Sequence, residues 1–385
     1  MPPGYISRKI TMVLLIGNYP LDRYPSMLLF NDLMRQGLTA AGVQAELVRP
    51  EPFFGNIFSS GTLGKWLGYI DKFVFFPFRL RKKLAAARPS IVHICDHSSA
   101  IYVPACCRRA PVVVTCHDLF AVRAALGEPV DRVPTWTGRI LQKWILRGLR
   151  QADALACISG ATASDAERIV RRNGAQPKIE IVHLAPNFDY ASMAPDKARK
   201  KLTAFFDVDL PFVLHVGSNT PRKNRAGLLR IFARGREKWS GQLVIAGEVL
   251  NHQLRRIAND LGLTDRVIEV ENPDGETLKA LYNLATAMLY PSRFEGFGWP
   301  IIEAQACGCP VICSNTAPLP EVAGDAGLYH DVNDEEGFAR DLLLMVNPDE
   351  RARWSKKSLA NAQRFSREKM IARYLEIYRS LGAAA

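Results

Sequence analysis

Two glutamates flank a glycine-containing stretch in the C-terminal half of the sequence. Glu295 directly precedes Gly296, Phe297 and Gly298, and Glu303 follows five residues later. Glycine lets the backbone approach a ligand closely, and the N–H groups at the start of a helix form an anion site. Carboxylates accept hydrogen bonds from hydroxyl groups. The stretch therefore predicts a site that holds a phosphate on backbone N–H groups and hydroxyl groups on two carboxylates, as a sugar nucleotide requires.

The flanking elements would position this site. The apolar run 287–290 predicts a buried strand before it. Pro300 suits the first turn of a helix and Gly308 suits its end, so we expect a helix to about residue 307. One helical turn rises about 5 Å, which would let both carboxylates face the same cleft. The alternative is a surface loop with two solvated glutamates.

A pair of cations follows another predicted buried strand, residues 211–217. Arg222 and Lys223 lie in a loop that begins at Gly217 and contains Pro221. Arginine binds phosphate through its planar fork, and lysine binds it as a point charge. One interpretation is a diphosphate clamp, and the other is a solvated surface pair.

His117 follows a predicted strand of the N-terminal half, residues 111–116. Alternating strands and helices predict an α/β fold with a doubly wound parallel sheet, whose ligands bind beyond the carboxyl ends of the strands. His117 would lie at such an end, where a structural role is the alternative to an active-site role. The sequence contains no G-x-G-x-x-G motif, so a Rossmann dehydrogenase is not supported.

These motifs resemble those of the retaining, nucleotide-sugar-dependent glycosyltransferases of the GT-B fold (glycosyl transferases group 1, family 4-like). The family's signature E-G-F-G-x-x-x-x-E is present at 295–303 and is followed by A-x-A-C-G-x-P-V at 304–311. The family's G-x-x-x-x-R-K-N loop matches 217–224, and its V-T-x-H-D-L stretch matches 114–119. The resemblance covers nearly the whole chain and is loosest from 50 to 90.

The resemblance implies two doubly wound, Rossmann-like domains that face each other across a cleft. It implies retaining transfer of a mannose-like or glucose-like hexose from a nucleoside diphosphate sugar to a glycan or lipid-linked acceptor, in polysaccharide or glycoconjugate biosynthesis. Glu303 would bind the ribose, and Glu295 the donor sugar. The implied catalytic residues are His117 and Glu295, and the implied donor-binding residues are Arg222, Lys223, Gly296, Phe297, Gly298 and Glu303. No metal and no cofactor beyond the donor are expected.

The length of 385 residues allows two domains, each with its own core. We place the N-terminal, acceptor-side domain at 1–195 and the nucleotide-sugar domain at 196–365. A final helix, 366–385, would pack back on the first domain. The polar stretch 189–201 is interpreted as the linker.

Charge is unevenly distributed along the chain. The net charge is +12, of which residues 1–190 carry +10, so an acidic partner should meet the first half. Within residues 53–84 the sequence combines an aromatic run that includes Phe58 with a basic run. The basic run consists of Arg79, Arg81, Lys82 and Lys83. One interpretation is a helix packed on the sheet with a solvated basic end, and the other is a segment that binds an anionic membrane surface.

The cysteines, the absence of long apolar runs and the charge bear on metal binding, localisation and rival functions. Cys307, Cys309 and Cys313 lack a nearby fourth ligand, so a metal cluster is not expected. No signal peptide and no membrane-spanning run are visible, which predicts a cytoplasmic protein. It would be peripheral on the inner face of the cytoplasmic membrane if the aromatic segment binds lipid.

The rival functions are an epimerase or hydrolase of the same fold, and a basic membrane- or nucleic-acid-binding protein. A nucleic-acid partner is not expected, because it leaves the glutamate pair unexplained.

Overall fold

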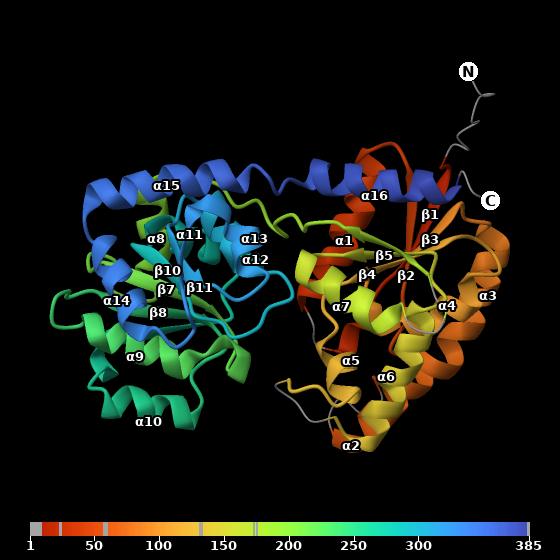
Figure 1. Cartoon of the computed structure of the whole chain (residues 1–385), viewed down its shortest axis with the longest axis horizontal. Helices are drawn as coiled ribbons and strands as arrows, with labels where there is room; N and C mark the ends of the chain where they lie inside the picture. The colour runs from red at the N-terminus through yellow and green to blue at the C-terminus, as the bar shows by residue number, and fades with distance from the viewer. Residues whose placement is uncertain are drawn as a thin grey trace. The chain divides into compact units, whose positions relative to one another are not determined.

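The chain forms two compact units, each with its own sheet and core (Figure 1). The structure, a computed structural model, describes residues 10–22, 25–56, 61–130, 134–171, 174 and 176–382. Unit 1 comprises residues 1–183 and 367–385, and unit 2 comprises 184–366. The boundary predicted after residue 195 therefore falls inside unit 2.

The sheet of unit 1 contains six parallel strands in the order β2-β1-β3-β4-β5-β6. The central strands are buried along their whole length, whereas the edge strands β2 and β6 are partly exposed, as expected for a sheet covered on both faces. The strands are β1 (Met12–Ile16), β2 (Gln44–Val48), β3 (Ile91–Ile94), β4 (Val112–Cys116), β5 (Ala154–Cys157) and β6 (Lys178–Ile181).

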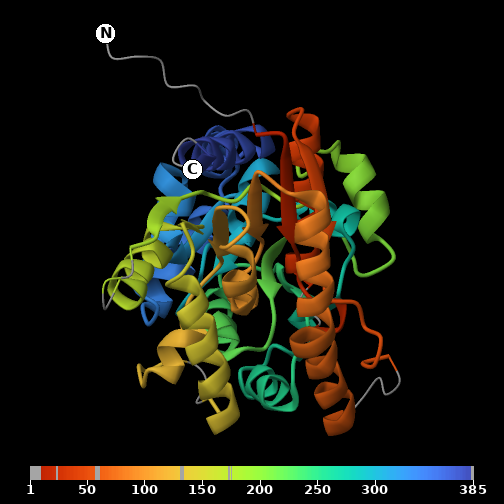
Figure 2. The same cartoon turned by 90° about the vertical axis from the view of Figure 1, so that its right-hand side faces the viewer.

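Helices cover both faces of this sheet, and the last one comes from the C-terminal end of the chain (Figure 2). They are η1 (Pro20–Asp22), α1 (Pro25–Ala40), α2 (Gly61–Ile70), η2 (Asp71–Phe75), α3 (Phe76–Ala87), η3 (His97–Tyr102), α4 (Val103–Cys106), α5 (Phe120–Ala125), α6 (Trp136–Leu149), α7 (Gly160–Val170) and α16 (Arg367–Gly382).

Residues 61–87 form one long helix, in which η2 is a π-helical turn between α2 and α3. Its α3 part packs on the sheet through Phe76, Leu80 and Leu84, as the first interpretation of this segment predicts. Two of the four cations in the basic run form ion pairs with the region of β2. Arg79 pairs with Glu51 at 2.6 Å, and Lys83 pairs with Glu46. Phe58, part of the predicted aromatic run, lies outside the described residues.

Unit 2 contains a second sheet of six parallel strands in the order β12-β11-β10-β7-β8-β9. The strands are β7 (Phe212–Gly217), β8 (Gln242–Gly247), β9 (Val267–Glu271), β10 (Ala287–Tyr290), β11 (Val311–Ser314) and β12 (Gly327–His330). The helices are α8 (Pro195–Leu202), η4 (Pro221–Lys223), α9 (Arg225–Gly235), α10 (His252–Asp260), η5 (Thr264–Arg266), α11 (Gly275–Leu284), α12 (Trp299–Ala306), α13 (Leu319–Ala323), η6 (Gly324–Ala326), α14 (Glu335–Leu344) and α15 (Pro348–Ala362). The prediction of an α/β fold with two doubly wound parallel sheets is confirmed.

The interpretation of residues 189–201 as a linker is wrong for its second half. Residues 195–202 form α8, which buries Ala198 and Leu202 and packs against α11. Apart from Pro195, the other residues of α8 are charged and mostly basic, and this composition hid the two apolar positions that lie four residues apart on one helical face.

Each sheet has one point where the order of its strands reverses. In unit 1, β2 lies on one side of β1 and β3 on the other; in unit 2, β8 lies on one side of β7 and β10 on the other. At such a switch point, the loops after two neighbouring strands leave in opposite directions and open a crevice, which is the usual ligand site of these folds. The topology therefore predicts ligand sites at the residues after β1 and β3 in unit 1, and at those after β7 and β10 in unit 2.

A buried polar network fixes α16 to the sheet of unit 1. His93 on β3 is fully buried and bonds through Nε2 to the hydroxyl of Thr115 at 2.7 Å, and through Nδ1 to the hydroxyl of Tyr378 at 2.6 Å. Tyr374 bonds to the same threonine at 2.8 Å. Burial lowers the pKa of His93 to about 3, so the ring is neutral at pH 7. Two tyrosines of one helix thus satisfy polar groups of two strands.

We expect Tyr378→Phe to lower the free energy of unfolding by about 1–3 kcal/mol, because His93 Nδ1 loses its partner where water does not reach it. Tyr374→Phe is the matched control, since His93 then keeps both of its bonds, and its effect should be smaller. Urea denaturation followed by circular dichroism measures both losses. A larger loss in Tyr374→Phe than in Tyr378→Phe would contradict this account of the network.

Candidate active site

Two loops meet at the switch point of unit 2. Residues 218–224 follow β7, and residues 291–298 follow β10, the strand that pairs with β7 in parallel. The backbone N–H of Arg293 donates to the carbonyl oxygen of Arg222 at 2.7 Å, which joins the loops directly. Beneath them, His215 Nδ1 bonds to the carbonyl oxygen of Leu289 at 3.0 Å. The two predicted anion-binding loops are therefore neighbours.

The carboxylate of Glu295 is the centre at which these loops converge. Its Oε1 accepts hydrogen bonds from Lys223 Nζ at 2.7 Å and from the Tyr290 hydroxyl at 2.9 Å. Its Oε2 accepts one from Arg222 Nη1 at 2.6 Å. Lys223 Nζ also donates to the Tyr290 hydroxyl and lies over the tyrosine ring, 4.6 Å from its centroid. The structure thus brings three of the predicted site residues into one cluster with a tyrosine.

The charges in this cluster determine one another's protonation. Burial alone would raise the pKa of Glu295, but the charges of Lys223 and Arg222 outweigh it and hold the pKa at about 2. Burial lowers the pKa of Lys223, and the carboxylate of Glu295 opposes that shift. The side chain of Arg222 is about one third exposed, whereas those of Lys223 and Glu295 are nearly enclosed. Arg222 is therefore the cation that a ligand in solvent can reach.

The backbone of both loops takes the left-handed conformation at one position each. Gly298, with φ of 108°, directly precedes α12, and Asn224, with φ of 52°, directly precedes α9. A side chain at Gly298 would be strained, and its Cβ would lie 3.0 Å from Leu319. This turn lets α12 begin at Trp299, with its amino end at the carboxyl edge of the sheet and Pro300 in its first turn.

Glu303 lies in α12 and has a different environment from Glu295. It is buried, and its Oε2 accepts a hydrogen bond from the Tyr282 hydroxyl at 2.9 Å. Burial raises the pKa of Glu303 to about 7, although the Tyr282 hydroxyl and the charge of Lys223 oppose this. One signature glutamate is therefore firmly ionised, and the other changes protonation near neutral pH.

Sequence reasoning missed the tyrosines and a buried arginine. The apolar run 287–290 predicts only a buried strand for Tyr290, although a tyrosine that ends a strand directly before the signature is also a candidate site residue. Tyr282 lies in α11 without a distinguishing motif. Arg225 is buried and donates at 2.6 Å to the carbonyl oxygens of Gly217 and Glu248. These bonds fix the start of the loop 218–224, which carries Arg222 and Lys223.

His117 lies in unit 1, directly after β4. Its Nε2 bonds to the carbonyl oxygen of Cys95 at 3.0 Å, and its ring stands edge-on to Phe30. A carbonyl only accepts, so Nε2 carries the proton of the neutral ring and Nδ1 holds the lone pair. Burial lowers the pKa of His117 despite the nearby carboxylate of Asp96. The histidine is thus poised as a neutral group with Nδ1 as its acceptor.

Buried amides surround the switch point of unit 1. Asn18 follows β1 and donates to the carboxylate of Asp96, which follows β3, at 2.9 Å. Asn31 in α1 is fully buried against Gly17, and within the described part of the chain neither polar atom of its side chain has a hydrogen-bond partner. Such groups have a high cost unless a ligand or water satisfies them.

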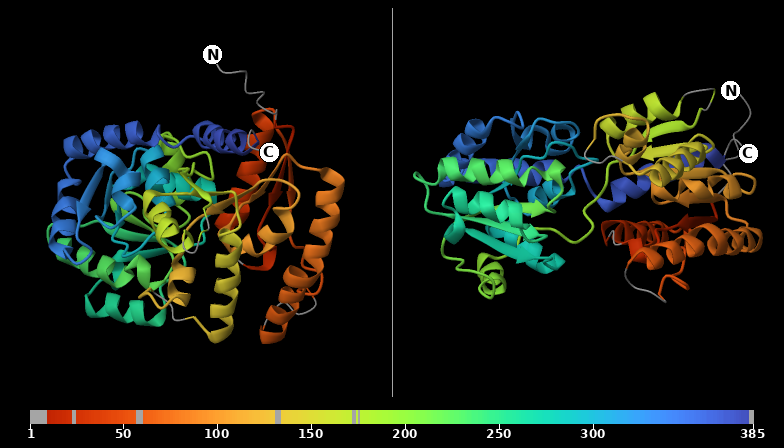
Figure 3. Two further views of the ribbon diagram at one scale, coloured as in Figure 1. Left: turned by 45° about the vertical axis from the view of Figure 1, so that its right-hand side comes forward. Right: turned by 90° about the horizontal axis from the view of Figure 1, so that it is seen from below.

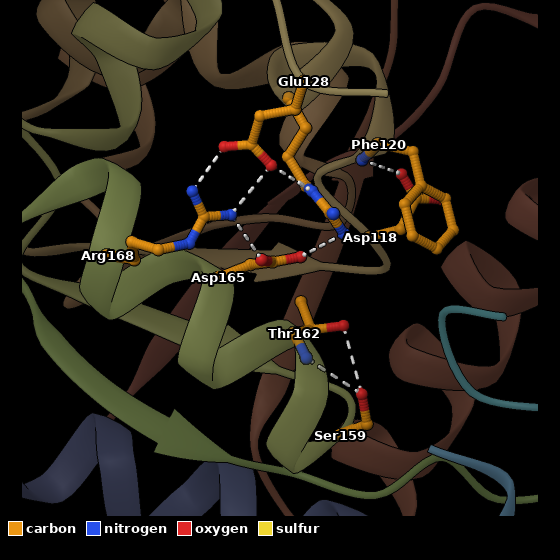
Figure 4. Close-up of polar contacts among 8 residues, drawn as sticks. Asp118, Phe120, Glu128, Ser159, Thr162, Asp165 and Arg168 are labelled. Carbon is orange, nitrogen blue, oxygen red and sulfur yellow. Dashed lines mark hydrogen bonds and ion pairs between the residues drawn. The ribbon is translucent and has the colours of Figure 1, made fainter. Parts of the chain in front are cut away.

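An ion-pair network holds the segment that follows His117 (Figure 4). Glu128 pairs with Arg123 at 2.8 Å and with Arg168 at 3.0 Å. Asp165 completes the network with contacts of 3.2 Å to Arg123 and 2.9 Å to Arg168. The two positive and two negative charges balance. Their contacts join α5 and Glu128 to α7, and this holds the segment that follows His117 in place.

Two absences can be stated for the described residues. They contain no group of three His, Cys, Asp or Glu side chains with the geometry to hold a metal ion. They also include no helix whose length and hydropathy would allow it to cross a bilayer.

Family comparison matches most of the chain. Residues 196–361 match the model of the glycosyl transferases group 1, and residues 33–190 match that of Glycosyltransferase Family 4. Among curated proteins, the O-antigen chain mannosyltransferase B of Escherichia coli is 31% identical to this chain over 299 residues, which cover 74% of each sequence.

Solved structures share the fold at low sequence identity. Sucrose-phosphate synthase from Thermosynechococcus elongatus superposes with a TM-score of 0.77 at 21% identity, over 97% of this chain and 100% of that one. The Anabaena HepE protein in complex with UDP superposes with a TM-score of 0.71 at 15% identity, over 96% and 100% of the two chains. The chain therefore belongs to the glycosyl transferases group 1 family and is a glycosyltransferase of the GT-B fold.

Proposed function

We propose that the protein transfers a hexosyl group from a nucleoside diphosphate sugar to a glycan or lipid-linked acceptor, with retention at the anomeric carbon. The observation that carries this proposal is the cluster of Glu295, Arg222 and Lys223 at the switch point of unit 2. It combines two cations for a diphosphate with one carboxylate for sugar hydroxyls.

The cations would stabilise the diphosphate as it leaves. Arg222 is the accessible member of the pair, and Lys223 lies behind it as a fixed positive charge. The amino end of α12, with the backbone from Gly296 to Trp299, would add its dipole. Donors that are already in place for the developing charge give the largest transition-state stabilisation. This arrangement would replace the divalent cation, so we propose a reaction that requires no metal and no further cofactor.

The two glutamates would have separate tasks. Glu295 is ionised and held by two cations, so it would accept hydrogen bonds from the hydroxyls of the donor sugar. Its two ion pairs reduce its nucleophilicity, and we infer transfer at the front face rather than through a covalent glycosyl-enzyme. Glu303, in α12, would accept hydrogen bonds from the ribose hydroxyls in its carboxylate form.

Unit 1 would hold the acceptor. His117 would contact the transferred sugar through Nδ1, and the amide of Asn31 offers a buried donor and acceptor for a hydroxyl group. Two likenesses support the substrate classes. One relative is an O-antigen chain mannosyltransferase, and a protein of the same fold binds UDP. The charge of +10 in residues 1–190 supports an acceptor presented at an anionic membrane surface.

We expect a nucleoside diphosphate to raise the melting temperature of the protein in the presence of EDTA. The counter-charges for the diphosphate are Arg222, Lys223 and the helix dipole, none of which EDTA removes. Thermal shift with UDP and GDP, with and without magnesium, measures the effect. Arg222→Gln is the variant that should reduce it, and stabilisation that occurs only with magnesium would contradict the proposal.

Glu295→Gln and Glu303→Gln should differ in their kinetic effects. Glu303→Gln should mainly weaken donor binding, because a ribose contact is the same in the ground state and the transition state. Glu295→Gln should mainly lower kcat, since its partner is the moving sugar. Initial rates with product analysis separate the two and also detect hydrolysis or epimerisation. Equal effects of both variants on kcat alone would count against the assigned roles.

Donor affinity should fall about tenfold from pH 8 to pH 6. The pKa of Glu303 is about 7 without ligand, so at pH 6 only about one tenth of the protein carries the carboxylate that the ribose needs. UDP-glucose and GDP-mannose are suitable ligands for calorimetry, because their diphosphates do not titrate in this range. The control is Glu303→Gln, which should bind weakly at both pH values. An equal pH dependence in the variant would assign the titration to another group.

A further inference from the structure

Helix α6 has a second apolar face that its own unit does not cover. Its inner face packs Ile145, Leu146 and Leu149 into the core of unit 1. Its outer face exposes Trp136, Ile140 and Trp144, which are spaced by four residues. A helix that covers a sheet normally has one apolar face and one polar face, so a second apolar stripe requires an explanation.

The long helix made of α2, η2 and α3 carries a similar stripe. Trp66, Ile70, Val74 and Phe78 are exposed and again spaced by four residues. In a regular α-helix such a series would drift around the axis, because a turn contains 3.6 residues. The π-helical turn η2 is wider and takes up more residues, which keeps the series closer to one line. Across both stripes the exposed fractions range from 38% to 74%.

The π-helical turn is a fixed part of the fold. Its Asp71 is buried and accepts hydrogen bonds from the Tyr19 hydroxyl at 2.7 Å and from the backbone N–H groups of Phe54 at 3.0 Å and Gly55 at 2.9 Å. The neighbouring Lys72 pairs with Asp22 at 2.8 Å. These bonds tie the turn to the loops after β1 and β2, so the stripe is held in place.

Ring contacts join the two helices. Phe73 of η2 lies edge-on to Trp144 of α6, with 6.5 Å between ring centroids. Tyr69 continues the line to Trp66, with centroid distances of 5.4 Å to Phe73 and 5.7 Å to Trp66. In the left view of Figure 3, the orange and yellow helices run alongside each other and extend beyond the sheet. Their exposed stripes and this line of rings form one feature, the two-helix face.

The charge beside this face is positive. Arg139 and Lys143 directly precede Ile140 and Trp144 of the apolar stripe, and Arg147 continues their spacing of four along α6. All three are exposed, and α6 contains no acidic residue. No ion pair of these cations occurs among the described residues. In contrast, Arg79 and Lys83 of α3 are paired with Glu51 and Glu46.

We propose that the two-helix face docks on the surface of an anionic lipid membrane, with the aromatic and aliphatic side chains at the interface and the cations of α6 against the headgroups. Tryptophan is favoured where one side of a ring is apolar and the other is wet, and basic side chains beside it bind anionic lipid. The cations of α6, rather than the basic run 79–83, supply the electrostatic part. The docking does not depend on the transfer reaction proposed above.

Sedimentation with vesicles tests this docking without any sugar nucleotide, so its outcome is separate from that of the transfer assay. The wild-type protein should bind vesicles of phosphatidylglycerol and phosphatidylcholine, should release in high salt, and should not bind phosphatidylcholine alone. R139Q/K143Q/R147Q should bind roughly 100-fold more weakly, because each cation near an anionic surface contributes about 1 kcal/mol. W136S should lose binding about tenfold without a change in melting temperature, and W136S/W144S should lose more, with a small fall in melting temperature because Trp144 also contacts Phe73.

The matched control removes the same charge elsewhere on unit 1. Arg108, Arg109 and Arg379 are exposed and lie outside both helices of the face, the first two before β4 and the last in α16. R108Q/R109Q/R379Q should bind vesicles within about twofold of wild type. Equal losses in the two triple variants, binding to neutral vesicles, or no vesicle binding at all would overturn the proposal. A dimer in light scattering that W136S/W144S abolishes would assign the face to a second copy of the chain and would also overturn it.

Discussion

The switch point of unit 2 depends on one buried charge that must be compensated. Glu295 is nearly enclosed, and its two oxygens are occupied by Lys223, Arg222 and Tyr290. Removing one member of a buried ion pair typically costs about 3–5 kcal/mol, because the remaining charge is left without a partner. The loops after β7 and β10 are therefore held together by the same groups that the proposed reaction uses. Pairing with Glu295 keeps both cations in place without any ligand.

The two units apply the same positional rule to different chemistry. In each, the loops after the two strands at the switch point are joined by a direct polar contact: Arg222 with Arg293 in unit 2, and Asn18 with Asp96 in unit 1. The charged cluster of unit 2 suits an anionic ligand, whereas the buried amides of unit 1 suit hydroxyl groups. The strand orders of the two sheets differ, but each sheet has a switch point, and the side chains beside the two switch points suit different ligands.

The sequence allowed the strands and the two loops of the candidate site to be predicted, because buried parallel strands are continuous apolar runs and the loops after them carry glycine, proline and charge. It did not allow the partners of those loops to be predicted. Tyr282 reaches Glu303 from α11, and Arg225 reaches two carbonyl oxygens that come together only in the folded sheet. Burial is also a property of the fold, so the separation of the two glutamate pKa values could not be read from their spacing. The exposed stripe on α6 was hidden because an amphipathic pattern does not reveal which of two apolar faces is covered.

The place of α16 in the fold has a consequence for synthesis on the ribosome. Unit 2 is continuous in the chain, so it can fold as soon as residues 184–366 have emerged. Unit 1 begins earlier but obtains Tyr374 and Tyr378, the partners of Thr115 and His93, only after all of unit 2 has been made. During that interval the sheet of unit 1 lacks the helix α16. The side chains of Thr115 and His93, which are buried in the complete fold, then lack their tyrosine partners. Vectorial synthesis, which usually lets the first domain fold first, here leaves the second domain as the first that can be completed.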